Sequence, residues 1–273
     1  MNLGVMVKLR DMAALDAALA RVKAMGFGLC QLSGGKPELF TADHAARIRE
    51  LTARHGIRVS ALGCSWGGAR EWDLVRGPLT IGLVPPAYRA EGIRALKQGA
   101  DFACEIGVPN VICHAGFIPN NPNDPDYGGV VCALREVARH FRERDRWFLF
   151  ETGTETPVTL LRTIEDIESD RVGINLDPAN LIMYGMGNPI DALDVVGRFV
   201  RHVHGKDGLC PTSGRKLGRE MPLGRGKVNV PAFIAGLKAI GYDGPIIIER
   251  EIAGPQQEAD ILAAKRLLES LIG

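Results

Sequence analysis

Four apolar segments in the second half of the chain each end on a side chain that can bind a metal ion. They are WFLFE, GINLD, RHVH and IIIE, which end at Glu151, Asp177, His204 and Glu249. Three carboxylates brought together without a cation would repel one another and raise one another's pKa. A divalent ion removes that repulsion, and oxygen ligands with one imidazole suit Mn²⁺, Mg²⁺, Co²⁺ or Zn²⁺. The residue types therefore predict a metal site, provided that the fold brings the four segment ends together.

The alternation of elements along the chain predicts such a fold. Eight short apolar segments are predicted β-strands: residues 3–7, 28–32, 58–62, 110–114, 147–151, 173–177, 201–204 and 246–249. Helical patterns lie between them, such as the stripe formed by Met12, Leu15, Leu19 and Val22. Proline stands where several helices should begin, and glycine where they should end. Eight β/α units predict an α/β protein, a (β/α)₈ TIM barrel, with residues 1–273 forming a single domain.

Long connections follow three of the predicted strands, at residues 63–86, 115–129 and 205–229. Long loops in a compact domain are usually functional. In a TIM barrel the active site lies at the carboxyl ends of the strands, where these loops lie. A doubly wound open sheet is the alternative fold, but no GxGxxG or GxxxxGK[ST] motif follows an early strand.

Composition narrows the class of protein. The net charge of +1 disfavours binding to a nucleic-acid backbone. The six cysteines show no CxxC spacing, which is typical of free thiols in a reducing cytoplasm. The N-terminus lacks the pattern of a secretory signal, and no apolar run reaches membrane-spanning length. These features predict a cytoplasmic protein without a membrane partner, and they leave a homo-oligomer open.

Strand parity predicts how the four candidate ligands meet. They come from the fifth to the eighth predicted strand, and each closes its strand, so all four side chains can converge at the barrel mouth. Residues i and i+2 of a strand face the same way, so His202 faces the axis one layer below His204. We expect His202 to support the ligand rather than to bind the ion itself.

Longer motifs around these residues suggest a family. They are FETGTETP, NLDPANL, HVHGKDG and LGRGKVNVPAFIAGLKAIGYDGPIIIERE. With them, the chain resembles the xylose isomerase-like TIM barrels, specifically the group of sugar phosphate isomerases and epimerases. That group includes tagatose/psicose 3-epimerases, hydroxypyruvate isomerases, inosose dehydratases and keto-glycoside epimerases.

The resemblance implies a metal-dependent isomerase or epimerase of a keto sugar or sugar derivative. Glu151, Asp177, His204 and Glu249 would hold one divalent ion, with Mn²⁺ favoured and Co²⁺, Mg²⁺ and Zn²⁺ remaining open. Glu151 and Glu249 would be the catalytic pair on opposite faces of the substrate, moving a proton through a metal-bound cis-enediolate. The partner would be a small carbohydrate.

Further residues are candidates for substrate binding. His114 ends the fourth predicted strand, Glu155 follows Glu151 in the ETGTETP motif, Asn180 follows Asp177 in DPAN, and Lys206 follows the ligand histidine. Trp66 and Trp72 lie in the long loop after the third strand, and we expect Trp66, the nearer to the strand end, to pack on a sugar face. Ketose 3-epimerases of the group carry a histidine where this chain has Asn180, and they lack the spacing that places Glu155. These departures disfavour a free ketohexose, and the KDG…LGRE…PLGRG loop resembles that of the uncharacterised and keto-glycoside members.

Other functions remain open on the sequence alone. A dehydratase or lyase of an inosose-like or keto-sugar substrate would use the same ion and base. A hydrolase like endonuclease IV would need more His and Asp ligands than a chain with six histidines offers. A non-catalytic sugar-binding barrel would not need two opposed glutamates. The sequence leaves open the exact substrate, the carbon acted on, and whether a phosphate is present.

Overall fold

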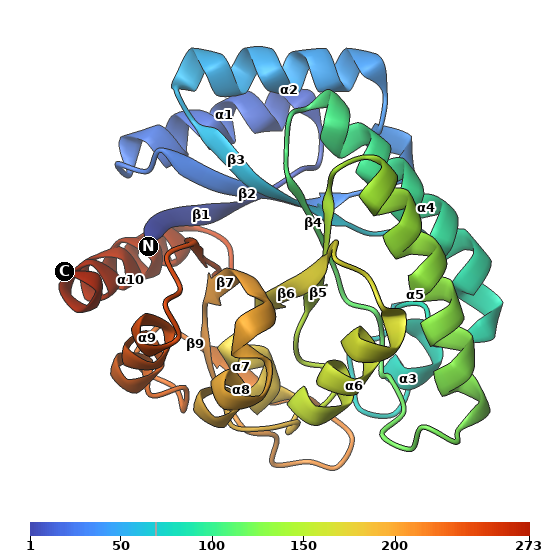
Figure 1. The fold of residues 1–273 in the computed structure, drawn as a ribbon. Helices are drawn as coiled ribbons and strands as arrows, with labels where there is room; N and C mark the ends of the chain where they lie inside the picture. The colour runs from blue at the N-terminus through green and yellow to red at the C-terminus, as the bar shows by residue number, and fades with distance from the viewer. Residues whose placement is uncertain (69) are drawn as a thin grey trace.

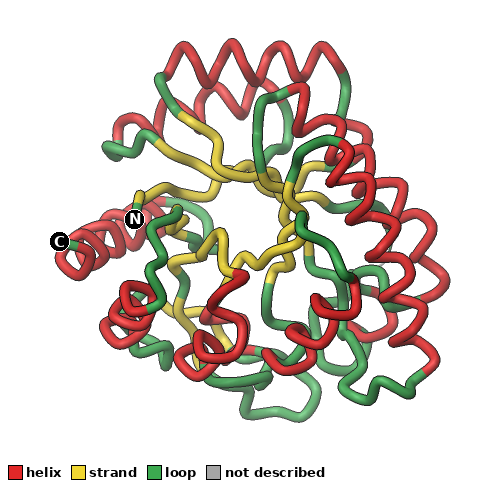
Figure 2. The backbone as a smooth tube through the Cα atoms, in the orientation of Figure 1, coloured by secondary structure: helices red, strands yellow, loops and turns green. Residues whose placement is uncertain are grey.

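Eight parallel strands close into a ring at the centre of the molecule, and helices surround them (Figures 1 and 2). The computed structural model describes residues 1–68 and 70–273. The ring runs in the order β1, β10, β7, β6, β5, β4, β3, β2, and β1 pairs with both β2 and β10 to close it. The strands are β1 (Asn2–Lys8), β2 (Leu29–Gly35), β3 (Arg58–Cys64), β4 (Asn110–Cys113), β5 (Trp147–Glu151), β6 (Val172–Leu176), β7 (Val200–Gly205) and β10 (Pro245–Ile248). The predicted (β/α)₈ barrel is confirmed, and all eight predicted strands occur with ends that shift by at most three residues.

Helices of the outer layer follow the strands and cover the barrel from outside (Figure 1). They are α1 (Met12–Ala24), α2 (Ala42–His55), α4 (Pro86–Glu105), α5 (Pro125–Glu143), α6 (Pro157–Ile167), α7 (Pro178–Met183), α8 (Pro189–Val196), α9 (Val230–Ala239) and α10 (Pro255–Ile272). Short 3₁₀ turns lie at Pro37–Leu39 and Gly197–Phe199. Within the described residues, every helix is too short or too polar to span a bilayer.

Local sequence explains where these helices begin and end. Thr156 caps α6 by accepting a hydrogen bond from the Thr159 N–H, and Pro157 fills the first helical position, where no N–H is needed. Helix α2 ends at Gly56, whose φ of 64° is in the left-handed region that glycine adopts at least cost. The chain then enters β3 two residues later, so these connections stay short.

Connections at the carboxyl ends of the strands carry additional elements. The β3–α4 connection contains the short helix α3 (Gly77–Thr80), and the β7–α9 connection contains an antiparallel pair, β8 (Asp207–Leu209) and β9 (Arg219–Met221). A hydrogen bond from the Leu74 N–H to the Arg215 oxygen (3.1 Å) joins these two connections. The predicted connection at 115–129 is too long, because Asp124 caps α5 and Pro125 begins it.

Alternation along β5 shows how the barrel aims its side chains. Phe148 and Phe150 belong to the large core between barrel and helices, and Phe148 packs edge-on against Phe141 of α5. Leu149 points the other way and packs with Ala61 and Ile112 in a separate small cluster. The two-residue period of a strand places Glu151 on the same side as Leu149. Tight packing on both faces of β5 therefore fixes the direction of its terminal carboxylate.

Candidate metal centre

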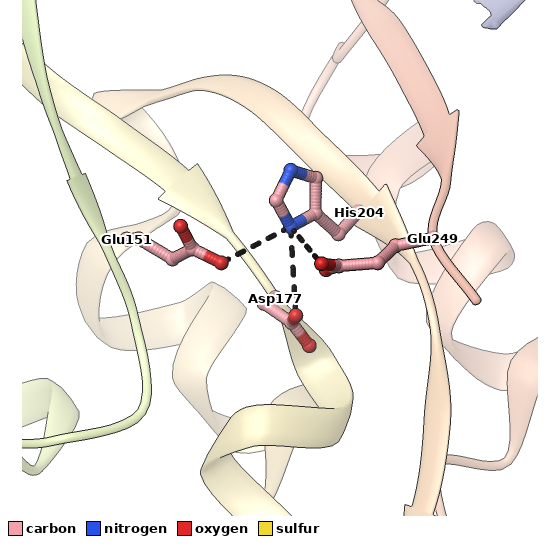
Figure 3. Close-up of side chains that lie close together, drawn as sticks. All are labelled: Glu151, Asp177, His204 and Glu249. Carbon is pink, nitrogen blue, oxygen red and sulfur yellow. Dashed lines mark ion pairs between the residues drawn. The ribbon is translucent and has the colours of Figure 1, made fainter. Parts of the chain in front are cut away.

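Glu151, Asp177, His204 and Glu249 meet at the mouth of the barrel. One ligand atom from each lies within 4.8 Å of the others. The Nδ1 atom of His204 lies 3.3 Å from a Glu151 oxygen, 3.5 Å from Asp177 Oδ2 and 3.1 Å from Glu249 Oε2, as Figure 3 shows. Asp177 and His204 have fully buried side chains, and those of the two glutamates are mostly buried. The structure brings together all four residues that the sequence predicts to be ligands.

Asp177 uses its two oxygens differently. It follows β6 directly and caps α7, because its Oδ1 accepts a hydrogen bond from the Asn180 N–H (2.9 Å). Its Oδ2 faces His204 and has no hydrogen-bond partner among the described residues. The backbone of Asp177 is held by Thr152, whose hydroxyl accepts from the Asp177 N–H at 2.8 Å. The helix cap therefore orients the carboxylate so that its second oxygen points into the cluster.

Glu249 continues the pairing of β10 by one residue. Its backbone N–H donates to the Gly205 oxygen at 3.3 Å, which holds its Cα in line with the strand. Glu249 Oε2 is buried and has no hydrogen-bond partner within the described part of the chain. Buried polar atoms in folded proteins nearly always have a partner. Two orphaned carboxylate oxygens beside an imidazole nitrogen are the donor set that a divalent cation requires, so the residues fit a metal ion.

Gln31 fixes the orientation of the His204 ring. The Gln31 side-chain oxygen accepts a hydrogen bond from His204 Nε2 at 2.8 Å, so Nε2 carries a hydrogen and Nδ1 faces the carboxylates. Burial alone would lower the pKa of His204, but the charges of Glu249 and Glu151 outweigh it and raise that pKa well above its ordinary value. The negative charge of these two glutamates also favours binding of a cation at His204 Nδ1.

His202 lies next to His204, with 5.9 Å between their ring centroids. Its Nδ1 lies 2.7 Å from the side-chain oxygen of Asn175, and its Nε2 lies 3.0 Å from Ser60 Oγ. The Asn175 amide nitrogen in turn lies 3.2 and 3.3 Å from the two ring nitrogens of His204. Burial, followed by the charge of His204, lowers the pKa of His202 well below its ordinary value. His202 is therefore a neutral residue that holds Asn175 against the ligand ring.

His114 directly follows β4 and lies beside Glu151. Its Nε2 is 3.6 Å from Glu151 Oε1, and its Nδ1 is buried without a partner among the described residues. Burial would raise the pKa of Glu151, but the charges of His114 and His204 outweigh it and hold that pKa below its ordinary value. Glu151 is therefore an ionised carboxylate at neutral pH.

Lys206 places a buried positive charge next to the cluster. Its Nζ lies 2.6 Å from a Glu251 oxygen, 3.3 Å from Glu249 Oε2 and 3.6 Å from Asp177 Oδ2. Burial would lower the pKa of Lys206, but the three carboxylates, Glu249 first, raise it well above its ordinary value. Lys206 also lies 3.4 Å from the side-chain oxygen of Asn180. The charged ammonium thus partly balances the negative charge of the neighbouring carboxylates.

Glu155 is buried in the β5–α6 connection. One of its oxygens accepts a hydrogen bond from the Thr154 hydroxyl (2.7 Å), and the other has no partner within the described residues. Burial raises the pKa of Glu155 to about 8, and the charge of Glu151 adds to the rise although the Thr154 bond opposes it. Glu155 is therefore mostly protonated at neutral pH and can donate a hydrogen bond.

The structure corrects the choice between two tryptophans. Trp66 is only 4% exposed and belongs to the core, where its ring lies against Gly92 of α4. Trp72 is 43% exposed, and its ring packs edge-on against His114 with 5.0 Å between centroids. Proximity to the strand end favoured Trp66, but the β3–α4 connection folds back and brings the more distant residue to the mouth.

Sequence reasoning missed two residues that hold the ligands in place. Gln31 is a single polar side chain inside the apolar strand β2, and it is 1% exposed. An unpaired amide at such a position signals an interior partner, but its partner His204 lies far away in the sequence. Thr152 directly follows Glu151 in the FETGTETP motif, but the motif holds three threonines and does not show which of them contacts Asp177.

Comparison with known proteins shows the family. Residues 19–271 match the xylose isomerase-like TIM barrel family, and the chain belongs to it. The uncharacterized protein MJ1311 of Methanocaldococcus jannaschii is 33% identical over 188 residues, which are 61% of this chain and 60% of that protein. The match therefore spans about three fifths of the length of this curated relative.

Solved structures share the fold over nearly the whole chain. A xylose isomerase domain protein from Planctomyces limnophilus is 35% identical with a TM-score of 0.90, covering 99% of this chain and 96% of its own. The 3-keto-D-glucoside 4-epimerase YcjR from E. coli is 16% identical with a TM-score of 0.71, and 99% of each chain is covered. The second similarity shows a shared fold, so the chemistry must be argued from the site.

Proposed function

We propose that the protein is a divalent-metal-dependent isomerase or epimerase of a keto sugar or sugar derivative. The observation that carries the proposal is the placement of Glu151 and Glu249 on opposite sides of His204 (Figure 3). A substrate held between them presents one face to each carboxylate. Two opposed carboxylates are what proton removal and return on opposite faces of one carbon require.

Glu151, Asp177, His204 and Glu249 would hold the ion. A divalent metal, when bound, supplies Lewis-acid polarisation of a carbonyl and charge stabilisation. Glu151 is ionised at neutral pH and can accept the proton from the carbon next to the carbonyl. Glu249 can return a proton on the other face, and Lys206, 3.3 Å from it, can hold a substrate oxygen as charge develops there.

Polar atoms around the cluster are suited to a hydroxylated substrate. His114 Nδ1 and Glu155 Oε1 are buried, and neither has a partner among the described residues. Asn180 is buried beside Lys206 and offers its amide. Trp72, half-exposed against His114, offers an aromatic face to sugar C–H groups in place of Trp66. We infer that these groups bind substrate hydroxyls, and the similarity to a keto-glucoside epimerase supports screening keto-glycosides first.

The test combines metal content with isotope exchange. Purified protein should bind about one Mn²⁺ or other divalent ion per chain, and the double variant Glu151→Gln/Glu249→Gln should lose it. The metal-loaded protein should then incorporate deuterium from D₂O at the carbon next to the carbonyl of a keto-glycoside or ketose. Release of water from the sugar would instead identify a dehydratase. Absence of any bound divalent ion after incubation with Mn²⁺, Co²⁺, Mg²⁺ and Zn²⁺ would overturn the proposal.

A further inference from the structure

Arg70 is a cation near the barrel mouth that forms no ion pair with any residue that the structure describes. It lies in the β3–α4 connection, and its guanidinium carbon is 5.8 Å from the ring centroid of Trp66 and 6.0 Å from that of Trp72. No other residue that the structure describes gives Arg70 an ion pair or a side-chain hydrogen bond. Lys206, a cation beside the cluster, is paired with Glu251 at 2.6 Å.

A short chain of contacts links Arg70 to the candidate metal centre. Trp72, over which Arg70 lies, packs against His114, and His114 lies 3.6 Å from Glu151. The buried thiol of Cys113, at the end of β4, also lies in the field of Arg70. Burial raises the pKa of Cys113 to about 12 although the Arg70 charge opposes the rise, so the thiol stays neutral and offers no counter-charge. The positive charge of Arg70 therefore has no anionic partner among the residues that the structure describes.

We propose that Arg70 binds an anionic group of the substrate, a carboxylate or a phosphate, at the end remote from the carbonyl. Cation–π contacts with the two indole rings restrain the guanidinium, and its N–H groups have no side-chain partner among the described residues. The N–H groups of a guanidinium match the two oxygens of a carboxylate or phosphate. A sugar with its carbonyl at the four-residue cluster and its far end along Trp72 brings such a group to Arg70. This inference rests on the proposed function and narrows it to acidic keto sugars.

The test compares three ketoses that differ only at the sixth carbon: D-fructose, D-fructuronate and D-fructose 6-phosphate. Calorimetric titration of the metal-loaded protein should show at least tenfold tighter binding of a charged ketose than of D-fructose. The variant Arg70→Met should abolish that preference, and Arg70→Lys should restore part of it. Arg94→Met is the matched control, because it removes the same charge from the exposed outer face of α4. The preferred ketose tells whether the group is a carboxylate or a phosphate.

Two results would overturn the inference. One is similar affinity of the wild type for all three ketoses, or no measurable binding of the charged ones. The other is a charge preference that Arg70→Met retains while its unfolding temperature matches that of Arg94→Met. Deuterium exchange with D-fructose but no preference for a charged ketose would overturn the anion site and leave the proposed function intact. A charge preference that depends on Arg70, without deuterium exchange on any sugar, would support the anion site and overturn the proposed function.

Discussion

The two oxygens of Asp177 allow its structural role and its ligand role to be separated. Oδ1 accepts the cap hydrogen bond from the Asn180 N–H, and Oδ2 faces His204 without a partner among the described residues. Asp177→Asn keeps an oxygen for the cap, but it places an NH₂ group, which cannot bind a cation, at the cluster. Asp177→Ala removes both functions. The pair of variants therefore isolates the contribution of one carboxylate oxygen to metal binding.

The expected magnitudes follow from the geometry. Loss of an outer-shell partner alone weakens metal binding by roughly 10–100-fold, so loss of the Asp177 ligand should weaken it by at least about 100-fold. At a metal concentration of 100 times the wild-type Kd, bound metal stabilises the wild type by about 2.7 kcal/mol, or on the order of 5–10 °C in Tm. Asp177→Asn should keep only about 0.4 kcal/mol of that. Without metal, Asp177→Ala should be less stable than Asp177→Asn by about 1 kcal/mol.

Thermal unfolding followed by circular dichroism, with EDTA or with Mn²⁺, measures both effects. We expect the wild type to gain stability with Mn²⁺, and both variants to gain little. With EDTA, the asparagine variant should unfold at a higher temperature than the alanine variant. A Mn²⁺-induced shift in Asp177→Asn as large as that of the wild type would refute the ligand role. Equal unfolding temperatures of the two variants in EDTA would refute the cap.

Three further substitutions test the cluster and the residues around it. Gln31→Leu removes the acceptor of His204 Nε2, so calorimetry should show roughly 10–100-fold weaker Mn²⁺ binding; unchanged affinity would exclude the orienting role. Glu249→Gln should leave the circular dichroism unchanged and lower deuterium exchange by on the order of 10²–10⁴-fold; an active variant would contradict its role in proton transfer. Burial raises the pKa of Glu155 from 4.5 to about 8, so the folded protein holds a proton that the unfolded chain releases in this range. Stability of the wild type relative to Glu155→Gln should therefore fall as the pH rises from 4.5 to about 8 in urea titrations; a constant difference would show that Glu155 is ionised when folded.

The sequence predicted the barrel because its periodicities are local. Short apolar runs end on a potential metal ligand in four consecutive β/α units, three times on a carboxylate and once on an imidazole, and the barrel topology places successive strand ends together. Parity along a strand then placed His202 on the same side as His204, and the two rings lie 5.9 Å apart in the structure. These inferences needed only the two-residue period and the order of the elements.

The loops were harder to predict, because no periodicity governs them. Trp66 and Trp72 lie six residues apart in one connection, and only its folded path decides which ring reaches His114. Arg70 lies between the same two residues, and its cation–π contacts with both rings have no counterpart in a sequence pattern. The partnership of Gln31 with His204 joins the second strand to the seventh of the barrel, which no local signal connects.

The sequence by itself determined the element order, the (β/α)₈ class and the four residues that meet at the mouth, because these follow from local patterns and from strand parity. Only the tertiary structure decided the direction of each ligand atom: the cap that turns Asp177 and the amide of Gln31 that turns His204. It also decided the charge states of Glu151, Glu155 and Lys206, since these depend on burial and on neighbours distant in the chain. Such long-range contacts arise when the ring of strands closes, and the chemistry of the site depends on them.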